Sequence, residues 1–192
     1  MKSKDILILM LNPFTRIAGW QAFGVGLVFV VITGIICTFS NVAFDGVVDM
    51  HLVKSLTLLQ SFEFLAIDIL SVVTVMTVTG FIVSKSFRII DILGTMTLSR
   101  SPLLILAFAG YFAVSPDINE LIKDPTIVFH SISFIIIILL SIPVTIWSII
   151  LMFNALKVSC GINGNKLGSA FIIALLVAEV ISKILIFNFI RL

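Results

Sequence analysis

The stretch LGSAFIIALLVAEVISKILIFNFI at residues 167–190 indicates a helix that crosses a lipid bilayer. A helix needs about 20 mostly apolar residues to cross the hydrocarbon core, and this stretch meets that requirement. Four further stretches share its apolar character: 17–39, 64–84, 101–115 and 129–156. The 101–115 stretch is short, so it thins the bilayer, borrows residues from Thr95–Ser101 or is re-entrant.

The composition excludes an ordinary soluble domain. Hydrophobic residues make up 60% of the chain, charged residues 11%, and the mean hydropathy is +1.27. A soluble domain carries roughly 25% charged residues, so too few polar side chains exist here to cover a water-facing surface. The formal net charge of +2 is too small to indicate nucleic-acid binding. We therefore expect the lipid bilayer as a partner, with a protein partner or a second copy in the membrane, and no nucleic acid.

The distribution of charge predicts the orientation of the spans. Eight basic residues lie before the first span or after the second and fourth: Lys2, Lys4, Arg16, Lys85, Arg88, Arg100, Lys157 and Lys166. The remaining loops are mostly acidic, with Asp45, Asp49, Glu63, Asp117, Glu120 and Asp124. Because basic loops stay in the cytoplasm, the N-terminus is predicted to be cytoplasmic and 101–115 must cross. The sequence thus predicts an all-α membrane bundle of about five helices in a single domain over 1–192.

Residues 87–98 have the pattern of an amphipathic helix. Arg88, Asp91, Thr95 and Ser99 fall on one helical stripe, and apolar side chains face the other way. This pattern favours a short helix lying in the cytoplasmic membrane interface. The alternative is a plain extension of the neighbouring spans.

Three ionisable residues fall within the predicted spans: Asp68, Glu179 and Lys183. Each costs about 2.5–3.5 kcal/mol near the bilayer centre, so they are not expected to face lipid unpaired. Glu179 and Lys183 are four residues apart in the favourable order for an intrahelical ion pair. Asp68 lies about five residues into its predicted span and can reach the interface. A structural pair that orients the last helix and a polar centre for an ion or substrate both remain open.

Small residues recur every four positions along the last span. These residues are Ala170, Ala174, Ala178 and Ser182. Small side chains at this spacing let a second helix approach closely. The partner helix belongs either to the same chain or to a second copy.

The chain carries no recognisable catalytic or metal-binding pattern. It has no zinc-protease, nucleophile-elbow or phosphate-loop motif, and His51 and His130 are far apart in sequence. We therefore expect no enzyme activity, no cofactor and no metal. Cys37 and Cys160 are predicted at opposite sides of the membrane, so they should not form a disulfide.

One region resembles a known family. Trp147, the run Asn154–Lys157 and the turn Cys160–Lys166, which contains Gly161 and Gly164, resemble the end of the Yip-one domain. This domain defines the Ypt/Rab-interacting family of small integral membrane proteins. A second match is Ser86–Arg88, followed by Pro102 after an amphipathic stretch.

The resemblance implies five spans with a cytoplasmic N-terminus. Eukaryotic relatives work in vesicle trafficking with Rab GTPases through a longer N-terminal region, whereas about 16 residues precede the first span here. The chain therefore resembles the short bacterial members, which implies the bacterial cytoplasmic membrane. We predict a non-enzymatic scaffold or adaptor. The alternative is a small homo-oligomeric transporter or channel subunit that uses Asp68, Glu179 and Lys183.

Overall fold

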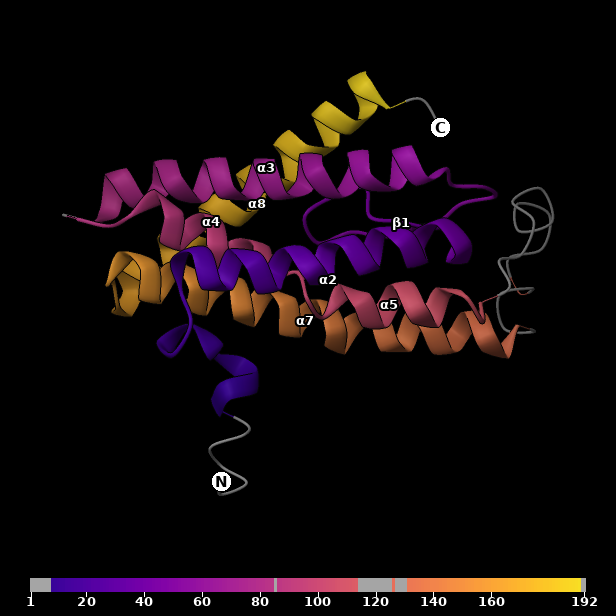
Figure 1. Cartoon of the computed structure of the whole chain (residues 1–192), viewed down its shortest axis with the longest axis horizontal. Helices are drawn as coiled ribbons and strands as arrows, with labels where there is room; N and C mark the ends of the chain where they lie inside the picture. Colours follow the sequence, from indigo (N-terminus) through magenta and orange to yellow (C-terminus); the bar gives the residue numbers. More distant parts are fainter. Residues whose placement is uncertain (1–7, 85, 114–125, 127–130, 191–192) are drawn as a thin grey trace.

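The computed structural model describes residues 8–84, 86–113, 126 and 131–190, and most of these are helical. Five segments within these described ranges are long and apolar enough to cross a membrane, and they pack as one bundle (Figure 1). The predicted all-α membrane bundle is therefore confirmed. The elements in chain order are η1 (Pro13–Thr15), α2 (Gly19–Ser40), β1 (Val42–Ala43), β2 (His51–Leu52), α3 (Leu58–Val83), α4 (Ile89–Leu98), α5 (Leu103–Gly110), α7 (Ile132–Cys160) and α8 (Gly164–Phe189).

The second span begins earlier than predicted. The α3 helix starts at Leu58 rather than at residue 64 because Thr57 caps it. The Thr57 hydroxyl accepts from the Gln60 amide, and the Gln60 side chain accepts from the Thr57 amide. This reciprocal pair satisfies two free amides at the helix start. Asp68 consequently lies ten residues into α3, about 15 Å along the helix axis, rather than the five residues predicted.

The third span is a broken helix made of α4 and α5. Together they cover Ile89–Gly110, so the short predicted stretch borrows residues from the segment before it. Pro102 has no amide to donate to the Leu98 carbonyl, which instead accepts from Ser101 at 3.0 Å. The helix tightens into a turn at 99–102, with Arg100 at its middle. Residues 114 and 115 of the predicted span lie outside the described residues.

The predicted interfacial position of 87–98 is wrong. Ile92 and residues 94–98 are buried, and α4 packs between α2, α3 and α7. The Thr95 and Thr97 hydroxyls donate to carbonyls one turn earlier, which makes them tolerable inside the bundle. A Cβ at Gly94 would collide with the Gly19 carbonyl, so the α2 and α4 backbones nearly touch there. The alternative, an extension of the neighbouring span, is what the structure shows.

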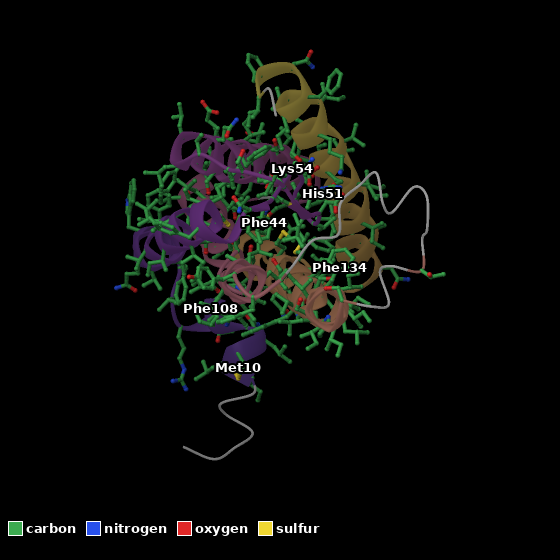
Figure 2. The ribbon with its side chains drawn as sticks, turned by 90° about the vertical axis from the view of Figure 1, so that its right-hand side faces the viewer. Met10, Phe44, His51, Lys54, Phe108 and Phe134 are labelled. Carbon is green, nitrogen blue, oxygen red and sulfur yellow. The ribbon has the colours of Figure 1, made fainter. Side chains whose placement is uncertain are left out.

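The connection between α2 and α3 folds back into the bundle. Strands β1 and β2 pair antiparallel, with Val42 opposite Leu52. Between them lies Phe44–Met50, which we call the inserted segment. Phe44 and Val47 are buried at 2% and 1% exposure, and Figure 2 shows Phe44 among the helices. Non-helical backbone is tolerated at membrane depth only where protein or a water-filled cavity surrounds it.

The apolar core is divided into two clusters along the bundle. Val47, Leu98 and Ala178 belong to one cluster, together with Met76, Met96, Met152 and Phe171. Phe44 belongs to the other, together with Phe64, Leu65, Leu103, Leu106 and Ile186. The inserted segment therefore contributes to both clusters, and polar groups lie at the boundary between them.

Candidate functional site

Three helices place charged residues at the boundary between the two apolar clusters. On α3, Asp68 follows Leu65 of one cluster by one turn, and on α8 Glu179 follows Ala178 of the other. Arg100 lies between Leu98 and Leu103 at the break in the third span. All three lie near the middle of their spans. The inserted segment completes the group, which we call the charged centre.

Arg100 and Asp68 form a buried ion pair. Arg100 Nη2 lies 3.1 Å from Asp68 Oδ2, and the two side chains are 1% and 0% exposed. Arg100 Nη1 also donates to the carbonyl oxygen of Val47 in the inserted segment. Two atoms of the pair, Asp68 Oδ1 and Arg100 Nε, are buried with no hydrogen-bond partner among the described residues. Buried polar atoms are usually bonded, so this pair is not fully satisfied.

Glu179 also holds the inserted segment. Its Oε2 accepts the Val48 amide at 3.0 Å, and its Oε1 lies 3.7 Å from Lys183 Nζ. Lys183 Nζ donates to Asp49 Oδ2 at 2.7 Å. A Cβ at Gly46 would collide with the Glu179 carboxylate, so a side chain at this position would displace the end of the Glu179 side chain.

Exposure decreases from the inserted segment towards the centre of the bundle. The side chains of Asp49 and Lys183 are each 42% exposed, Glu179 is 16% exposed and Asp68 is inaccessible. Among the described residues, the exposed members of the charged centre, Asp49 and Lys183, thus lie at the 41–57 connection. Glu179 lies between the exposed pair and the buried pair.

The ion pair with Lys183 favours the ionised form of Asp49. Partial burial raises the pKa of Asp49, but hydrogen bonds from Lys183 and from the Met50 amide lower it by more. The net pKa is lowered from its ordinary value of 3.8. Asp49 is therefore an anion at neutral pH and fixes Lys183 at the mouth of the charged centre.

Asp45, Asp49 and His51 come together near this mouth. Their possible ligand atoms all lie within 4.8 Å of one another, so the three residues could hold a cation. The sequence, in contrast, predicts no metal site. The same atoms already bond within the protein. Asp45 contacts His51 at 2.6 Å, and Asp49 contacts Lys183. His130 lies outside the described residues.

Further hydrogen-bonded hydroxyl groups lie along α4 and α7, on the other side of Arg100 from the inserted segment. The Ser148 hydroxyl of α7 donates to the Ser99 carbonyl at 3.0 Å. One turn earlier on α4, the Thr95 and Ser159 hydroxyls lie 3.1 Å apart. At the start of α4, Arg88 and Asp91 form an ion pair. Polar side chains of α4 and α7 thus lie between the charged centre and the start of the third span at Arg88.

The small-residue stripe packs within the chain. Ala174, Ala178 and Ser182 are buried at 2%, 0% and 0% exposure, and α8 packs mainly on α3. Ala170 is only partly buried. Of the two partners left open by the sequence, the neighbouring helix of the same chain is the one observed. This close contact packs the helix that carries Glu179 against the helix that carries Asp68.

The residues of the Yip-one resemblance fasten chain segments together. Trp147 Nε1 and Asn154 Nδ2 each donate at 2.9 Å, to the Met10 and Leu11 carbonyls respectively. Lys166 Nζ donates to the Val83 carbonyl at the end of α3. Gly161 and Gly164 have φ values of +62° and +70° in the α7–α8 turn, and Pro102 begins α5. None of these residues belongs to the charged centre.

Two parts of the site differ from the sequence prediction. The charge pattern predicts Arg100 in a cytoplasmic loop, but it is buried in the bundle. The inserted segment was assigned to an outer acidic loop, although its apolar residues Phe44, Val47 and Val48 are a signal of burial. Asp68, Glu179 and Lys183 do come together, with Glu179 contacting Lys183 and Asp68 joining through Arg100 and Val47.

The fold and the site define a multi-pass membrane protein with a charged centre between its helices. No family model, curated protein or solved structure matches the chain.

Proposed function

We propose that this protein translocates a proton or another small cation across the membrane, with Glu179 as the exchanging carboxylate. The observation that carries the proposal is the position of Glu179. It lies between a half-exposed ion pair, Lys183 with Asp49, and an inaccessible one, Arg100 with Asp68. Ionisable residues inside a membrane protein commonly mark an ion or proton path.

The balance of charge supports a cation rather than an anion. Four carboxylates, those of Asp45, Asp49, Asp68 and Glu179, accompany two cations, Arg100 and Lys183. Both cations are already bound to carboxylates, whereas an anion would need an uncommitted donor. Glu179 is the member of the group whose strongest partner is a backbone amide. It is therefore the carboxylate that can exchange its partner most readily.

Broken helices and inserted loops also favour translocation. In transporters, interrupted helices place backbone polar groups and charges near the middle of the bilayer. Here the break at 99–102 places Arg100 in the core, and the hydroxyls of Thr95, Ser148 and Ser159 continue towards the far end. Five spans are few for a carrier that works alone, so we propose a homo-oligomer.

Flux measurements in vesicles test this proposal. The purified protein is reconstituted into liposomes, and gradients of H⁺, Na⁺, K⁺ and Cl⁻ are imposed in turn. We expect flux of one cation, no chloride flux, and loss of the cation flux in Glu179→Gln. The matched control is Gly24→Ala, because a Cβ at Gly24 meets nothing within 4 Å. Cation flux that is unaltered in Glu179→Gln would contradict the proposal.

A second candidate function is that of a scaffold or adaptor of the Yip-one type in a bacterial cytoplasmic membrane. A surface groove favours it, lined by Val83, Ser84, Ser86, Cys160, Gly161, Ile162 and Lys166. These residues come from the two connections that are predicted to be cytoplasmic. Crosslinking in the native membrane, followed by mass spectrometry, should then recover a near-stoichiometric partner that is lost when 157–166 is altered. Recovery of self-crosslinks alone would favour the homo-oligomeric translocator.

A further inference from the structure

We propose that the inserted segment, Phe44–Met50, is the gate of the charged centre, and that Arg100 and Glu179 are the positioning residues that hold it closed. The inference rests on the proposed translocation function. It assigns a moving part to a site whose charges alone do not explain how an ion reaches Glu179.

The contacts that fasten the segment come from two separate elements. Arg100, at the break between α4 and α5, donates to the Val47 carbonyl. Glu179, on α8, accepts the Val48 amide at 3.0 Å. Lys183 adds the contact to Asp49 at 2.7 Å. Two of the three contacts are to the main chain, so they hold the path of the segment itself and not merely one of its side chains.

The connection has two parts: a base formed by the β1–β2 pair, and a tip, the inserted segment, that can move relative to this base. Its base is held by the β1–β2 pair and by the Val53 amide, which donates to the Asn41 carbonyl at 2.9 Å. The tip has no helical hydrogen-bond ladder, in contrast to the five spans around it. Local opening occurs where few backbone hydrogen bonds must break. Release of the tip therefore requires loss of the Arg100, Glu179 and Lys183 contacts and withdrawal of Phe44 and Val47 from the apolar clusters, but not the unfolding of a helix.

Charge at Glu179 couples the gate to cation binding. A hydrogen bond to an ionised carboxylate is roughly twice as strong as one to a neutral group, so neutralising Glu179 weakens its bond to the Val48 amide. The charged groups around this site are Asp45 and Asp49 on the segment, Lys183 on α8, Asp68 on α3 and Arg100 at the α4–α5 break, and Asp45 is paired with His51. A proton or cation on Glu179 therefore loosens the segment that covers it.

Thiol labelling of the segment tests the gate directly and without any flux measurement. Val47→Cys is introduced into a variant in which Cys37 and Cys160 are replaced by Ala, and the purified protein is placed in nanodiscs. A charged, water-soluble maleimide is the probe. Val47 is 1% exposed, so its cysteine should react slowly, whereas His51→Cys, at a side chain that is 57% exposed, should react fast. The His51→Cys rate serves as the reference for full access.

Two changes should open the gate. Gly46→Ala displaces the Glu179 carboxylate from the Val48 amide, and the pair Asp68→Asn with Arg100→Gln removes the Val47 anchor without leaving an unpaired charge. Each should raise the Val47→Cys labelling rate roughly tenfold or more, as expected for loss of a charge-assisted hydrogen bond. The matched control Gly24→Ala should leave the rate unchanged, and thermal melting should show that every variant is folded.

The outcomes separate the gate from the translocation function. Two results would overturn the gate, even if Glu179→Gln abolishes flux. One is a Val47→Cys labelling rate that is equal in all folded variants. The other is a Val47→Cys rate as fast as the His51→Cys rate when no gate-opening change is present. Labelling that rises in Gly46→Ala and in the double variant supports the gate. If the same preparations carry no cation flux, the gate stands and the translocation proposal fails.

Discussion

Asp68 and Arg100 meet 3.1 Å apart, side chain to side chain, at the boundary between the two apolar clusters of the bundle. They come from different spans and are separated by 32 residues in the chain. Neither side chain is accessible, so each neutralises a charge that the membrane interior would otherwise oppose. The pair also joins α3 to the break in the third span, and Arg100 extends the connection to the inserted segment.

This pair predicts a non-additive effect on stability. Asp68→Asn alone, or Arg100→Gln alone, leaves one buried charge without its partner and should cost about 3–5 kcal/mol of unfolding free energy. The double variant is neutral at the site and should cost less than either single variant. Unfolding in detergent by chemical denaturant measures all three. Single variants as stable as the native protein would contradict the buried pair.

The contact between α2 and α4 predicts a difference between two glycines. A Cβ at Gly94 collides with the Gly19 carbonyl, whereas a Cβ at Gly24 meets nothing within 4 Å. Gly94→Ala should therefore cost about 1–3 kcal/mol, as expected for overpacking, and lower the melting temperature. Gly24→Ala, on the same helix pair, should be neutral or slightly stabilising. Equal melting temperatures for the two variants would refute the close approach of α2 and α4.

The spans could be predicted from the sequence because length and apolar composition alone determine whether a helix crosses the bilayer. The start of α3 could also have been predicted, since Thr57 and Gln60 have the spacing of a capping box. That α4 and α5 form a single span was harder to predict from the sequence. Pro102 and the polar residues around it have the pattern of a loop, and only packing against α2 and α7 shows that they are buried.

The charged centre could be predicted only in part. Asp68, Glu179 and Lys183 stood out because each interrupts an apolar run. Arg100 did not, because it sits beside Pro102 at a break, and its partner Asp68 is distant in sequence. Pairing between helices depends on tertiary packing, which no local pattern encodes. The charge pattern predicts the inserted segment as an outer loop because it counts the sign of Asp45 and Asp49 and takes no account of their apolar neighbours.

The lowered pKa of Asp49 predicts how the mouth of the charged centre responds to acid. A carboxylate with a lowered pKa in the folded state stabilises the protein fully above its ordinary value, 3.8, and loses this contribution as the pH falls through the folded pKa. Asp49→Asn should therefore be less stable than the native protein at neutral pH, and the difference should shrink only below 3.8. Melting curves across this range provide the measurement. A difference that is independent of pH would show that the ion pair with Lys183 contributes nothing.

Trp147 and Asn154 predict local protection of the N-terminal segment. Each donates a hydrogen bond to a backbone carbonyl, at Met10 and Leu11. The double variant Trp147→Phe with Asn154→Ala loses both bonds. Each loss should lower the free energy of local opening of this segment by about 0.5–1.5 kcal/mol. Limited proteolysis should then cut near residue 10 faster, while the melting temperature changes little. Trp20→Phe, at a side chain that is 71% exposed, is the control and should not alter the cleavage rate.

The most direct test of translocation is the electrical current through the purified protein in a planar bilayer. Native protein, Glu179→Gln and Gly24→Ala are compared under a gradient of a single salt, with the pH varied on one side. We predict a current that reverses at the potential of a cation or of H⁺, is retained in Gly24→Ala and is lost in a folded Glu179→Gln. A current that follows chloride, or one that persists in Glu179→Gln, would contradict the account.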